Sequence, residues 1–274
     1  MIKYNGLKIE TTKFPNGEIC IKPFDISLSK TKEHTIDFYF QSNEDLILLM
    51  MIKGHLDENG IKDVLLMINY MPYSRMDRSE NGSIFTLKYV ADFINKLNFS
   101  EVRVKEAHSD VTPALIKRCK NIHTTAQLGE YVCCKNQDLD MFKDVVYYPD
   151  STAYKRYHKD FDMFKYYAIG NKIRNFETGK ILSLEIIGNL PKEPFKVIMV
   201  DDLCSRGGTF LLGAKKLREL GATDITLVVT HCENSIFDGE IFKNNLINRV
   251  YCLDTMVLDE EKLKQTNGKL IIVQ

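Results

Sequence analysis

The sequence contains no apolar run near the ~20 residues needed to cross a lipid bilayer, and no apolar stretch of the kind found in secretory signals follows Met1. It also has no excess of either charge, because Lys plus Arg and Asp plus Glu both number 37. A general nucleic-acid-binding protein normally carries a basic excess. These absences argue against membrane, secreted and nucleic-acid-binding proteins, and we expect a cytoplasmic location.

The seven cysteines include no CxxC pair, and their odd number does not fit a framework of disulfides. Cys133 and Cys134 are adjacent in the sequence, which places them poorly for bridging each other. Cysteines of cytosolic proteins are normally reduced. We therefore predict free, mostly buried thiols rather than disulfides or a structural zinc site.

Short apolar runs alternate with helical patterns along the chain, without low-complexity segments or short repeats. This alternation is typical of βαβ units that build a parallel sheet. We expect an α/β protein of two similar Rossmann-like halves, residues 1–138 and 139–274, divided in the polar stretch around Cys134–Asp144. The predicted strands are Thr35–Phe40, Val64–Tyr70, Val102–Glu106, Val145–Tyr148, Val197–Val200, Ile225–Thr230 and Leu270–Val273, and the predicted helices are Leu46–His55, Thr86–Leu97 and Phe210–Leu220.

The most specific segment runs from Val200 to Thr209, where an apolar strand ends in two aspartates and is followed by a small-residue turn and a helix. Ligands of open α/β sheets bind at the carboxyl ends of strands. Gly207 and Gly208 would let backbone N–H groups approach an oxyanion, and the N-terminus of the next helix favours negative charge. Asp201 and Asp202 fit the neighbouring hydroxyls of a ribose, or a hydrated metal ion. We interpret this segment as a ribose-phosphate site rather than a plain turn.

The loop resembles the phosphoribosyl-pyrophosphate-binding loop of type I phosphoribosyltransferases and of the ribose-phosphate diphosphokinases (PRPP synthetases). Five other segments resemble the diphosphokinases in the same order: Phe14–Ile19, Pro72–Arg78, Ala107-His108, Pro149-Asp150 with Arg156 downstream, and Asn171–Arg174. An ordinary phosphoribosyltransferase lacks the first three. The resemblance implies a phosphoribosyltransferase-type fold with a parallel sheet in each half.

The resemblance also implies roles for individual residues. Those matching the ATP site are Phe14, Asn16 and Glu18 for the adenine, with Arg75, Asp77, Arg78 and His108 near the phosphates. His108 and Asp150 would lie beside Mg²⁺. Lys172 and Arg174 match catalytic cations on a mobile flap at Ala168–Lys180, which Gly170 and Gly179 bracket as candidate hinges. The matching ribose-phosphate residues are Asp201 and Asp202 for the hydroxyls, and Ser205, Arg206, Gly207, Gly208 and Thr209 for the 5′-phosphate.

The chain departs from the family pattern at four points. Ser205-Arg206 replace Asp-Thr, and Glu106-Ala107 replace Asp-Leu before the histidine. Ser151-Thr152-Ala153 replace a segment with a Gly-Gly pair, so hydroxyl groups would stand in for close backbone N–H groups, and the chain is shorter than a typical synthetase. Arg206 adds a cation whose planar fork would fit a second phosphate, as in ADP-ribose, or would face solvent.

The implied reaction transfers the β,γ-diphosphate of ATP to the anomeric hydroxyl of ribose 5-phosphate and releases AMP, with Mg²⁺ as cofactor. Three alternatives stay open: the same chemistry on ADP-ribose, a phosphoribosyltransferase, and a non-catalytic relative that binds nucleotide. In the family, the Phe-Asn-Glu segment reaches the ATP site of a neighbouring subunit. We therefore expect a homo-oligomer with Phe14 and Glu18 near a subunit boundary, and no nucleic-acid or membrane partner.

Overall fold

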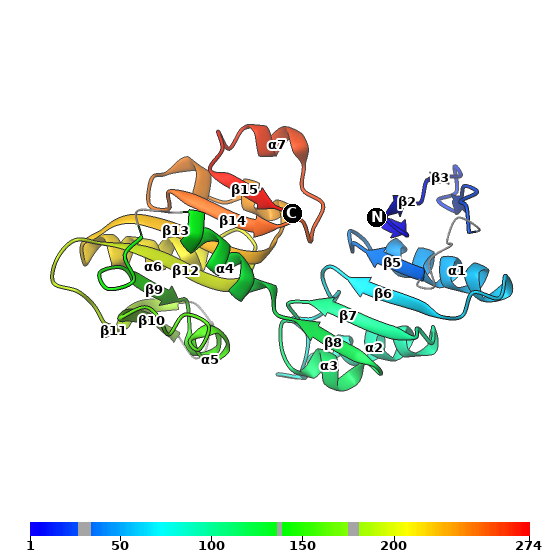
Figure 1. Cartoon of the computed structure of the whole chain (residues 1–274), viewed down its shortest axis with the longest axis horizontal. Coiled ribbons are helices and arrows are strands. Elements are labelled where there is room, and N and C mark those ends of the chain that lie inside the picture. The colour runs from blue at the N-terminus through cyan, green and yellow to red at the C-terminus, as the bar shows by residue number, and fades with distance from the viewer. Residues whose placement is uncertain (27–33, 136–138, 175–180) are drawn as a thin grey trace. The chain divides into compact units, whose positions relative to one another are not determined.

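The computed structural model describes residues 1–26, 34–135, 139–174 and 181–274, and it describes only the backbone of 172–174 and 181–183. Backbone contacts divide the chain into two compact units (Figure 1). The first unit comprises Met1–His123 and Thr255–Val257, and the second comprises Thr124–Asp254 and Leu258–Gln274. The main division therefore falls at residue 124, earlier than the 138/139 boundary expected from the polar stretch.

The first unit is built on a six-stranded sheet with the order β2-β1-β5-β6-β7-β8. Its strands are β1 (Ile2–Tyr4), β2 (Leu7–Lys8), β5 (His34–Phe38), β6 (Val64–Ile68), β7 (Glu101–Lys105) and β8 (Cys119–Ile122). Strands β5 to β8 run parallel, whereas β1 is antiparallel to β2 and β5. Strand β6, with the sequence VLLMI, is apolar throughout, as expected for a strand that is covered on both faces.

Three helices pack against the core of this sheet: α1 (Glu44–Glu58), α2 (Thr86–Lys96) and α3 (Val111–Leu115). Helix α2 buries Leu87, Ala91 and Ile94, which recur at helical spacing on one face. The chain enters α1 through a turn in which the Asp45 carboxylate accepts N–H groups from Gln41 at 2.7 Å and Ser42 at 3.0 Å. These contacts fix the start of the helix beside the end of β5.

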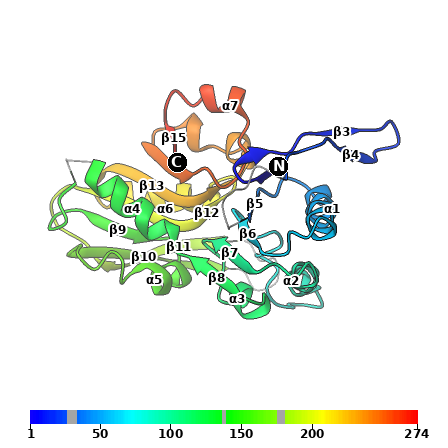
Figure 2. The same ribbon diagram turned by 45° about the vertical axis from the view of Figure 1, so that its right-hand side comes forward.

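A separate hairpin, β3 (Thr11–Lys13) and β4 (Ile19–Ile21), belongs to the first unit but not to its sheet. Figure 2 shows this hairpin projecting from the rest of its unit. Residues 11–18 are all exposed. Its tip is therefore held mainly by its own hydrogen bonds, such as that from Phe14 N–H to the Glu18 carbonyl at 2.8 Å.

The second unit is built on a seven-stranded sheet with the order β11-β10-β9-β12-β13-β14-β15. Its strands are β9 (Val145–Tyr148), β10 (Tyr166–Arg174), β11 (Ile181–Asn189), β12 (Phe195–Cys204), β13 (Ala222–Cys232), β14 (Arg249–Leu253) and β15 (Leu270–Val273). All neighbours are parallel except β10 and β11. The remaining elements are α4 (Thr124–Lys135), α5 (Ser151–Tyr157), α6 (Gly208–Glu219), α7 (Glu260–Lys264) and the 3-10 turns η1 (Asn234–Asp238) and η2 (Ile241–Lys243).

Alternate residues of β9 face two different cores. Val145 and Tyr147 belong to the core that includes α6, whereas Val146 and Tyr148 belong to the core that includes α4 and α5. Each of the four side chains is at most 1% exposed. A strand buried on both faces is apolar without alternation, which is why this segment was recognisable in the sequence.

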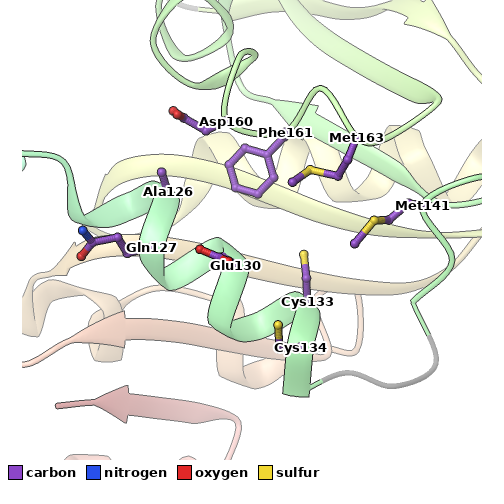
Figure 3. Close-up of a pocket in the computed structure, with 9 residues that line it drawn as sticks. All are labelled: Ala126, Gln127, Glu130, Cys133, Cys134, Met141, Asp160, Phe161 and Met163. Atoms are coloured by element: carbon purple, nitrogen blue, oxygen red, sulfur yellow. The ribbon is translucent and has the colours of Figure 1, made fainter.

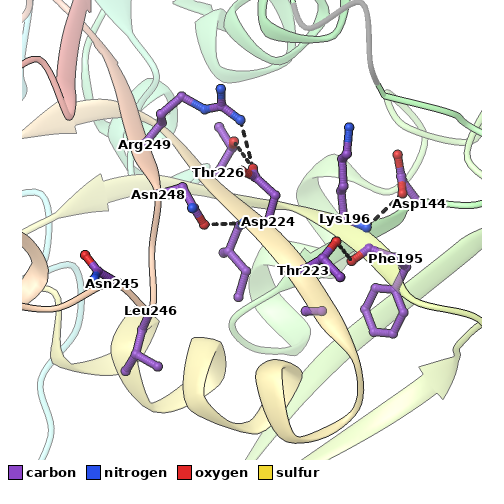
Figure 4. Close-up of polar contacts among 12 residues, drawn as sticks. Asp144, Phe195, Lys196, Thr223, Asp224, Thr226, Asn245, Leu246, Asn248 and Arg249 are labelled. Atoms are coloured by element: carbon purple, nitrogen blue, oxygen red, sulfur yellow. Dashed lines mark hydrogen bonds and ion pairs between the residues drawn. The ribbon is translucent and has the colours of Figure 1, made fainter.

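Polar contacts fix the N-terminal ends of the strands in the second unit (Figure 4). The Asp144 carboxylate, just before β9, accepts the Lys196 backbone N–H at the start of β12 at 2.8 Å. Arg249, at the start of β14, pairs with Asp224 on β13 at 2.9 Å. Because the strands are parallel, these contacts stabilise their N-terminal ends. Their carboxyl ends lead into the loops that carry the candidate site.

The predicted α/β fold with two parallel-sheet halves is confirmed, and the predicted strands Val145–Tyr148 and Leu270–Val273 coincide with β9 and the edge strand β15. All seven cysteines are free, as expected. Three of them are buried, but Cys20 and Cys134 are exposed. Within the described ranges, no helix has the length and apolar character needed to span a membrane.

Candidate active site

The last residues of β12 place two carboxylates where the strands of the second sheet reach their carboxyl ends. Strand β12 stays paired with β13 as far as Cys204, so Asp201 and Asp202 are held by the sheet rather than by a free loop. The Asp202 N–H donates to the Asp201 carboxylate at 2.9 Å, and Asp202 is 5% exposed. The two carboxylates are therefore fixed acceptors at the position where α/β sheets bind ligands.

The two glycines of the loop have different structural roles. Gly207 adopts the left-handed conformation, with φ +78°, and a Cβ there would collide with the Ile241 side chain. Gly208 begins α6, and a Cβ there would meet nothing within 4 Å. The fold therefore requires a glycine at 207 but not at 208. The small residue at 208 leaves the first N–H groups of the 12-residue helix unobstructed, which is the geometry of an anion site.

The side chains of the loop differ in how they are held. The Ser205 hydroxyl is hydrogen-bonded to Ser235 at 2.9 Å, and Ser235 donates to Glu233 at 2.9 Å. Arg206 is exposed, and its guanidinium makes no ion pair or hydrogen bond within the described part of the chain. Thr209 is half-buried in the first turn of α6. An unpaired cation thus stands next to the unobstructed helix N-terminus.

Negative charge accumulates around Asp201. Burial raises the pKa of Asp201 well above the usual carboxyl value, and the charges of Asp202 and Asp150 raise this pKa further. The Arg156 guanidinium lies 3.6 Å from the Asp202 carboxylate and offsets part of this charge. A bound cation, or hydroxyl groups that donate to the carboxylates, would relieve the remaining repulsion.

These carboxylates have the chemistry that Mg²⁺ prefers, since it binds hard oxygen ligands. Within the described residues, no group of three or more His, Cys, Asp and Glu side chains is arranged to hold a metal by itself. Protein-bound Mg²⁺ commonly uses one or two carboxylates together with waters and substrate phosphates. The donors present therefore fit Mg²⁺ that arrives with a nucleotide better than a permanently bound ion.

Asp150 has a structural role that we did not predict. Its Oδ1 accepts the N–H groups of Thr152 at 3.0 Å and Ala153 at 3.1 Å, so it caps helix α5. The segment after Pro149-Asp150 is thus the first turn of a helix. The cap occupies these two N–H groups, and the side chains of Ser151 and Thr152 are exposed. That their hydroxyls bind a phosphate stays a prediction.

Tyr147 lies beneath the carboxylates and was not identified from the sequence. It is 0% exposed, and its hydroxyl has no hydrogen-bond partner among the described residues. Burial raises the pKa of Tyr147, and the charges of Asp150 and Asp201 raise it further. A Cβ on Gly213 would lie 2.6 Å from the tyrosine hydroxyl, and one on Gly170 would collide with it. The two glycines therefore make room for this side chain.

The predicted catalytic cations lie on β10, where the Lys172 backbone pairs with Leu184 and the Arg174 backbone pairs with Ile181. The structure describes only the backbone of these two residues, so the catalytic roles of their side chains stay predictions. Gly170 lies inside the paired part of β10 rather than at a hinge, and Gly179 falls outside the described residues. The described start of the predicted flap is thus a β-strand.

In the first unit, two loops at the carboxyl edge of the sheet are joined by a hydrogen bond. The Ser109 hydroxyl, after β7, donates to the Asp77 carboxylate, after β6, at 2.6 Å. This contact brings the segment with Arg75 close to the loop that carries half-buried His108. Four predicted ATP-site residues therefore belong to neighbouring loops of one unit: Arg75, Asp77, Arg78 and His108.

Other predicted residues of the first unit have visible local roles. Arg78 is exposed and pairs with Glu80 at 2.6 Å. Phe14, Asn16 and Glu18 share the exposed tip of the β3–β4 hairpin, where the Asn16 side chain accepts the Glu18 N–H at 3.2 Å. Phe14 is 54% exposed. A large aromatic ring on an exposed hairpin tip has little contact within its own unit.

Glu106, in the segment before His108, is buried. Its side chain is 0% exposed and lies 4.0 Å from His123, and its backbone has an unusual φ of +44°. The acidic residue before Ala107 is therefore a fully buried carboxylate, and His108 stays the predicted metal-side residue of the first unit.

No protein-family model matches the chain. Among curated proteins, the ribose-phosphate pyrophosphokinase of Pyrococcus abyssi is 27% identical over 237 residues, which cover 83% of this chain and 77% of that protein. The enzyme of the same name from Pyrococcus furiosus is 27% identical over 230 residues, with coverage of 81% and 77%. A third, from Mycoplasmopsis pulmonis, is 24% identical over 272 residues, with coverage of 97% and 81%.

Among solved structures, the crystal structure of phosphoribosylpyrophosphate synthetase from Mycobacterium smegmatis superposes with a TM-score of 0.77. The match covers 97% of this chain and 85% of that chain at 21% sequence identity. It supports the fold, with its two α/β halves, independently of the motifs from which the resemblance was first inferred.

Proposed function

We propose that the chain, which is similar in sequence to ribose-phosphate pyrophosphokinases, transfers the β,γ-diphosphate of ATP to the anomeric hydroxyl of ribose 5-phosphate and releases AMP. The observation that carries the proposal is the arrangement at the end of β12 and the start of α6. There, two aspartates fixed by the sheet precede a helix N-terminus that no side chain covers at position 208. Diol acceptors beside an anion site are the complement of a ribose phosphate.

In this proposal Asp201 and Asp202 accept hydrogen bonds from the two neighbouring ribose hydroxyls. Arg156, 3.6 Å from Asp202, holds that carboxylate in place and limits the repulsion between the pair. The N–H groups at the start of α6 bind the 5′-phosphate, with the Thr209 hydroxyl as a further donor. The Ser205 hydroxyl donates to Ser235, which itself donates to Glu233, so it would join them only by leaving that hydrogen bond. The carboxylates on β12 and the N–H groups at the start of α6 are preorganised by the fold, so little order is lost on binding.

ATP is proposed to bind through the first unit. Arg75 and Arg78 are exposed cations suited to its phosphates, and Asp77, fixed by Ser109, and His108 lie on the adjoining loops. Phe14, Asn16 and Glu18 would contact the adenine of ATP bound to another copy of the chain, which requires a homo-oligomer. Light scattering at assay concentration should show at least a dimer, and an active monomer would contradict this arrangement.

The chemical step is an in-line displacement at the β-phosphorus of ATP by the anomeric hydroxyl, so positioning and charge stabilisation dominate catalysis. Lys172 and Arg174 are proposed to stabilise the charge that develops on the transferring group. Asp150 and His108 are the proposed residues beside Mg²⁺, and the ion would offset the charge of the ATP phosphates when bound.

ADP-ribose is a second candidate acceptor because of the position of Arg206. Arg206 is an exposed cation without a partner within the described part of the chain, beside the proposed 5′-phosphate site. A 5′-diphosphate such as that of ADP-ribose would place a second phosphate within reach of such a cation. Ribose 5-phosphate nevertheless stays the leading acceptor, because the relatives are named for it.

The test is AMP formation from ATP and Mg²⁺ with ribose 5-phosphate, with ADP-ribose or with no acceptor. The proposal predicts acceptor-dependent AMP that is fastest with ribose 5-phosphate. A faster reaction with ADP-ribose would transfer the proposal to that acceptor. Transfer of the phosphoribosyl group of PRPP to a base, with release of diphosphate and without any need for ATP, would indicate a phosphoribosyltransferase instead.

A further inference from the structure

A cavity of about 440 Å³ lies in the second unit, and none of the residues assigned to ribose phosphate is among its described lining residues (Figure 3). One wall is helix α4. The other is formed by Met141, which precedes β9, and by residues 160–163, which follow α5. The cavity is lined by Ala126, Gln127, Glu130, Cys133, Cys134, Met141, Asp160, Phe161 and Met163. Its volume lies within the range of roughly 300–1,000 Å³ that is usual for small-molecule sites.

The walls of this cavity are apolar and rich in sulfur. Phe161 is 4% exposed and packs so closely on α4 that a Cβ on Gly129 would collide with its ring. Met141 and Met163 are 37% and 45% exposed, so their side chains face open space rather than a packed core. Figure 3 shows these two side chains and Cys133 around the same space. Thioethers and an aromatic ring form an adaptable apolar surface.

The charge of the lining has one sign. Glu130 and Asp160 are the charged residues that line the cavity, and no lysine or arginine is among its described lining residues. Both are exposed, and neither has an ion-pair partner within the part of the chain that the structure describes. The carboxylate charges therefore act on whatever enters the cavity, and they disfavour phosphates such as those of ATP.

We propose that this cavity binds a small organic cation, a molecule with an apolar or aromatic body and one ammonium-type charge. The body fills the space between Phe161, Met141 and Met163, and the charge lies at the rim near Glu130 and Asp160. An aromatic ring and thioethers are favourable neighbours of a cation as well as of apolar groups. This site is independent of the proposed diphosphate transfer, because it uses none of the residues assigned to it.

The methionines allow a direct test on the intact protein. The chain has 10 methionines, and two of them line the cavity. With ¹³C-methyl methionine, titration with benzylammonium should shift the Met141 and Met163 signals saturably, as assigned by Met141→Leu and Met163→Leu. Met50 and Met51, which are 41% and 44% exposed on α1, are the matched controls and should not shift. Benzoate and benzyl alcohol, which have the same ring without the positive charge, should bind more weakly.

The carboxylates are tested by the double variant Glu130→Gln with Asp160→Asn. Both residues are exposed, so the fold should persist, which an unchanged signal of Met199, buried in a core of the second unit, would verify. The variant should bind benzylammonium roughly 3- to 10-fold more weakly, the scale expected for two exposed charge pairs. Benzyl alcohol should bind it as it binds the unmodified chain. Equal shifts with all three probes, no shift at Met141 and Met163, or signals that change only with protein concentration would each overturn the proposal.

Discussion

Replacing Gly208 by alanine separates ligand binding from folding at the proposed phosphate site. Gly208 is the first residue of α6, its φ is not in the left-handed region, and a Cβ there would meet nothing within 4 Å. Alanine is the better helix former, and removal of a flexible glycine at a compatible position typically stabilises a protein by about 0.4–1 kcal/mol. The variant Gly208→Ala should therefore unfold at the same temperature or a slightly higher one.

The same methyl group would stand where the 5′-phosphate approaches the backbone. Loss of one charge-assisted hydrogen bond to the phosphate corresponds to about 1.5–3 kcal/mol. Since each ~1.4 kcal/mol is a factor of ten, binding of ribose 5-phosphate should weaken roughly 10- to 150-fold. The apparent affinity for ATP should change little, because the ATP residues were assigned to the other unit.

The assays are thermal unfolding and calorimetric titration with ribose 5-phosphate, and Gly207→Ala is the contrasting variant. At position 207 the Cβ collides with Ile241 and the backbone is left-handed, so alanine should destabilise the protein by about 1–3 kcal/mol. Gly207→Ala should thus lose stability, and Gly208→Ala should lose affinity alone. Unchanged affinity for ribose 5-phosphate in a stable Gly208→Ala protein would refute the assignment of this helix N-terminus to the phosphate.

Three further predictions concern single side chains. Lys172→Ala should lower turnover by at least ~100-fold with little change in ATP affinity, and near-normal turnover would remove Lys172 from the mechanism. Arg206→Ala should lower kcat/KM for ADP-ribose roughly 10- to 150-fold and leave ribose 5-phosphate unchanged, whereas equal losses would assign Arg206 to the shared phosphate. Because the pKa of Asp201 is raised in the folded protein, the unfolded chain releases a proton that the folded chain keeps. Stability should therefore fall as pH rises from the ordinary carboxyl pKa to the raised one, and urea unfolding of Asp201→Asn should show a flatter dependence; an unchanged pH dependence would contradict the raised pKa.

The parts of the fold that were predictable are those with a local physical cause. Strand β9 is buried on both faces, so its four residues are all apolar, and its limits match the prediction. The segment from the end of β12 to the start of α6 was recognisable because paired aspartates followed by paired glycines suit a ligand site or a tight turn. Helix α6 begins at Gly208 rather than at the predicted Phe210, because the left-handed Gly207 ends the loop one residue before it.

Other features depend on contacts that are distant in sequence. The β10–β11 hairpin was missed, because β10 contains Gly170, Asn171 and Lys172, which interrupt any strand-like pattern. Tyr147 was interpreted as one more apolar strand residue. Its hydroxyl lies against Gly170 and Gly213, which belong to other elements, so the strand sequence alone does not indicate its surroundings.

The helix cap at Asp150 and the boundary between the two units were not predicted from the sequence. Asp150 stands directly before a helix, where aspartate is a preferred cap, and this signal could have been used. Helix α4 belongs to the second unit, where Thr124 and Thr125 are hydrogen-bonded to Thr230 at 3.0 and 2.8 Å, and these contacts join residues that are more than 100 positions apart in the sequence.

Diphosphate transfer from ATP to ribose 5-phosphate can be measured by following the products that the purified chain forms from ATP, Mg²⁺ and ribose 5-phosphate. We expect AMP and a diphosphorylated ribose 5-phosphate in equal amounts, with no AMP when the acceptor is omitted. ADP as the nucleotide product, or AMP that forms at the same rate without any acceptor, would contradict it.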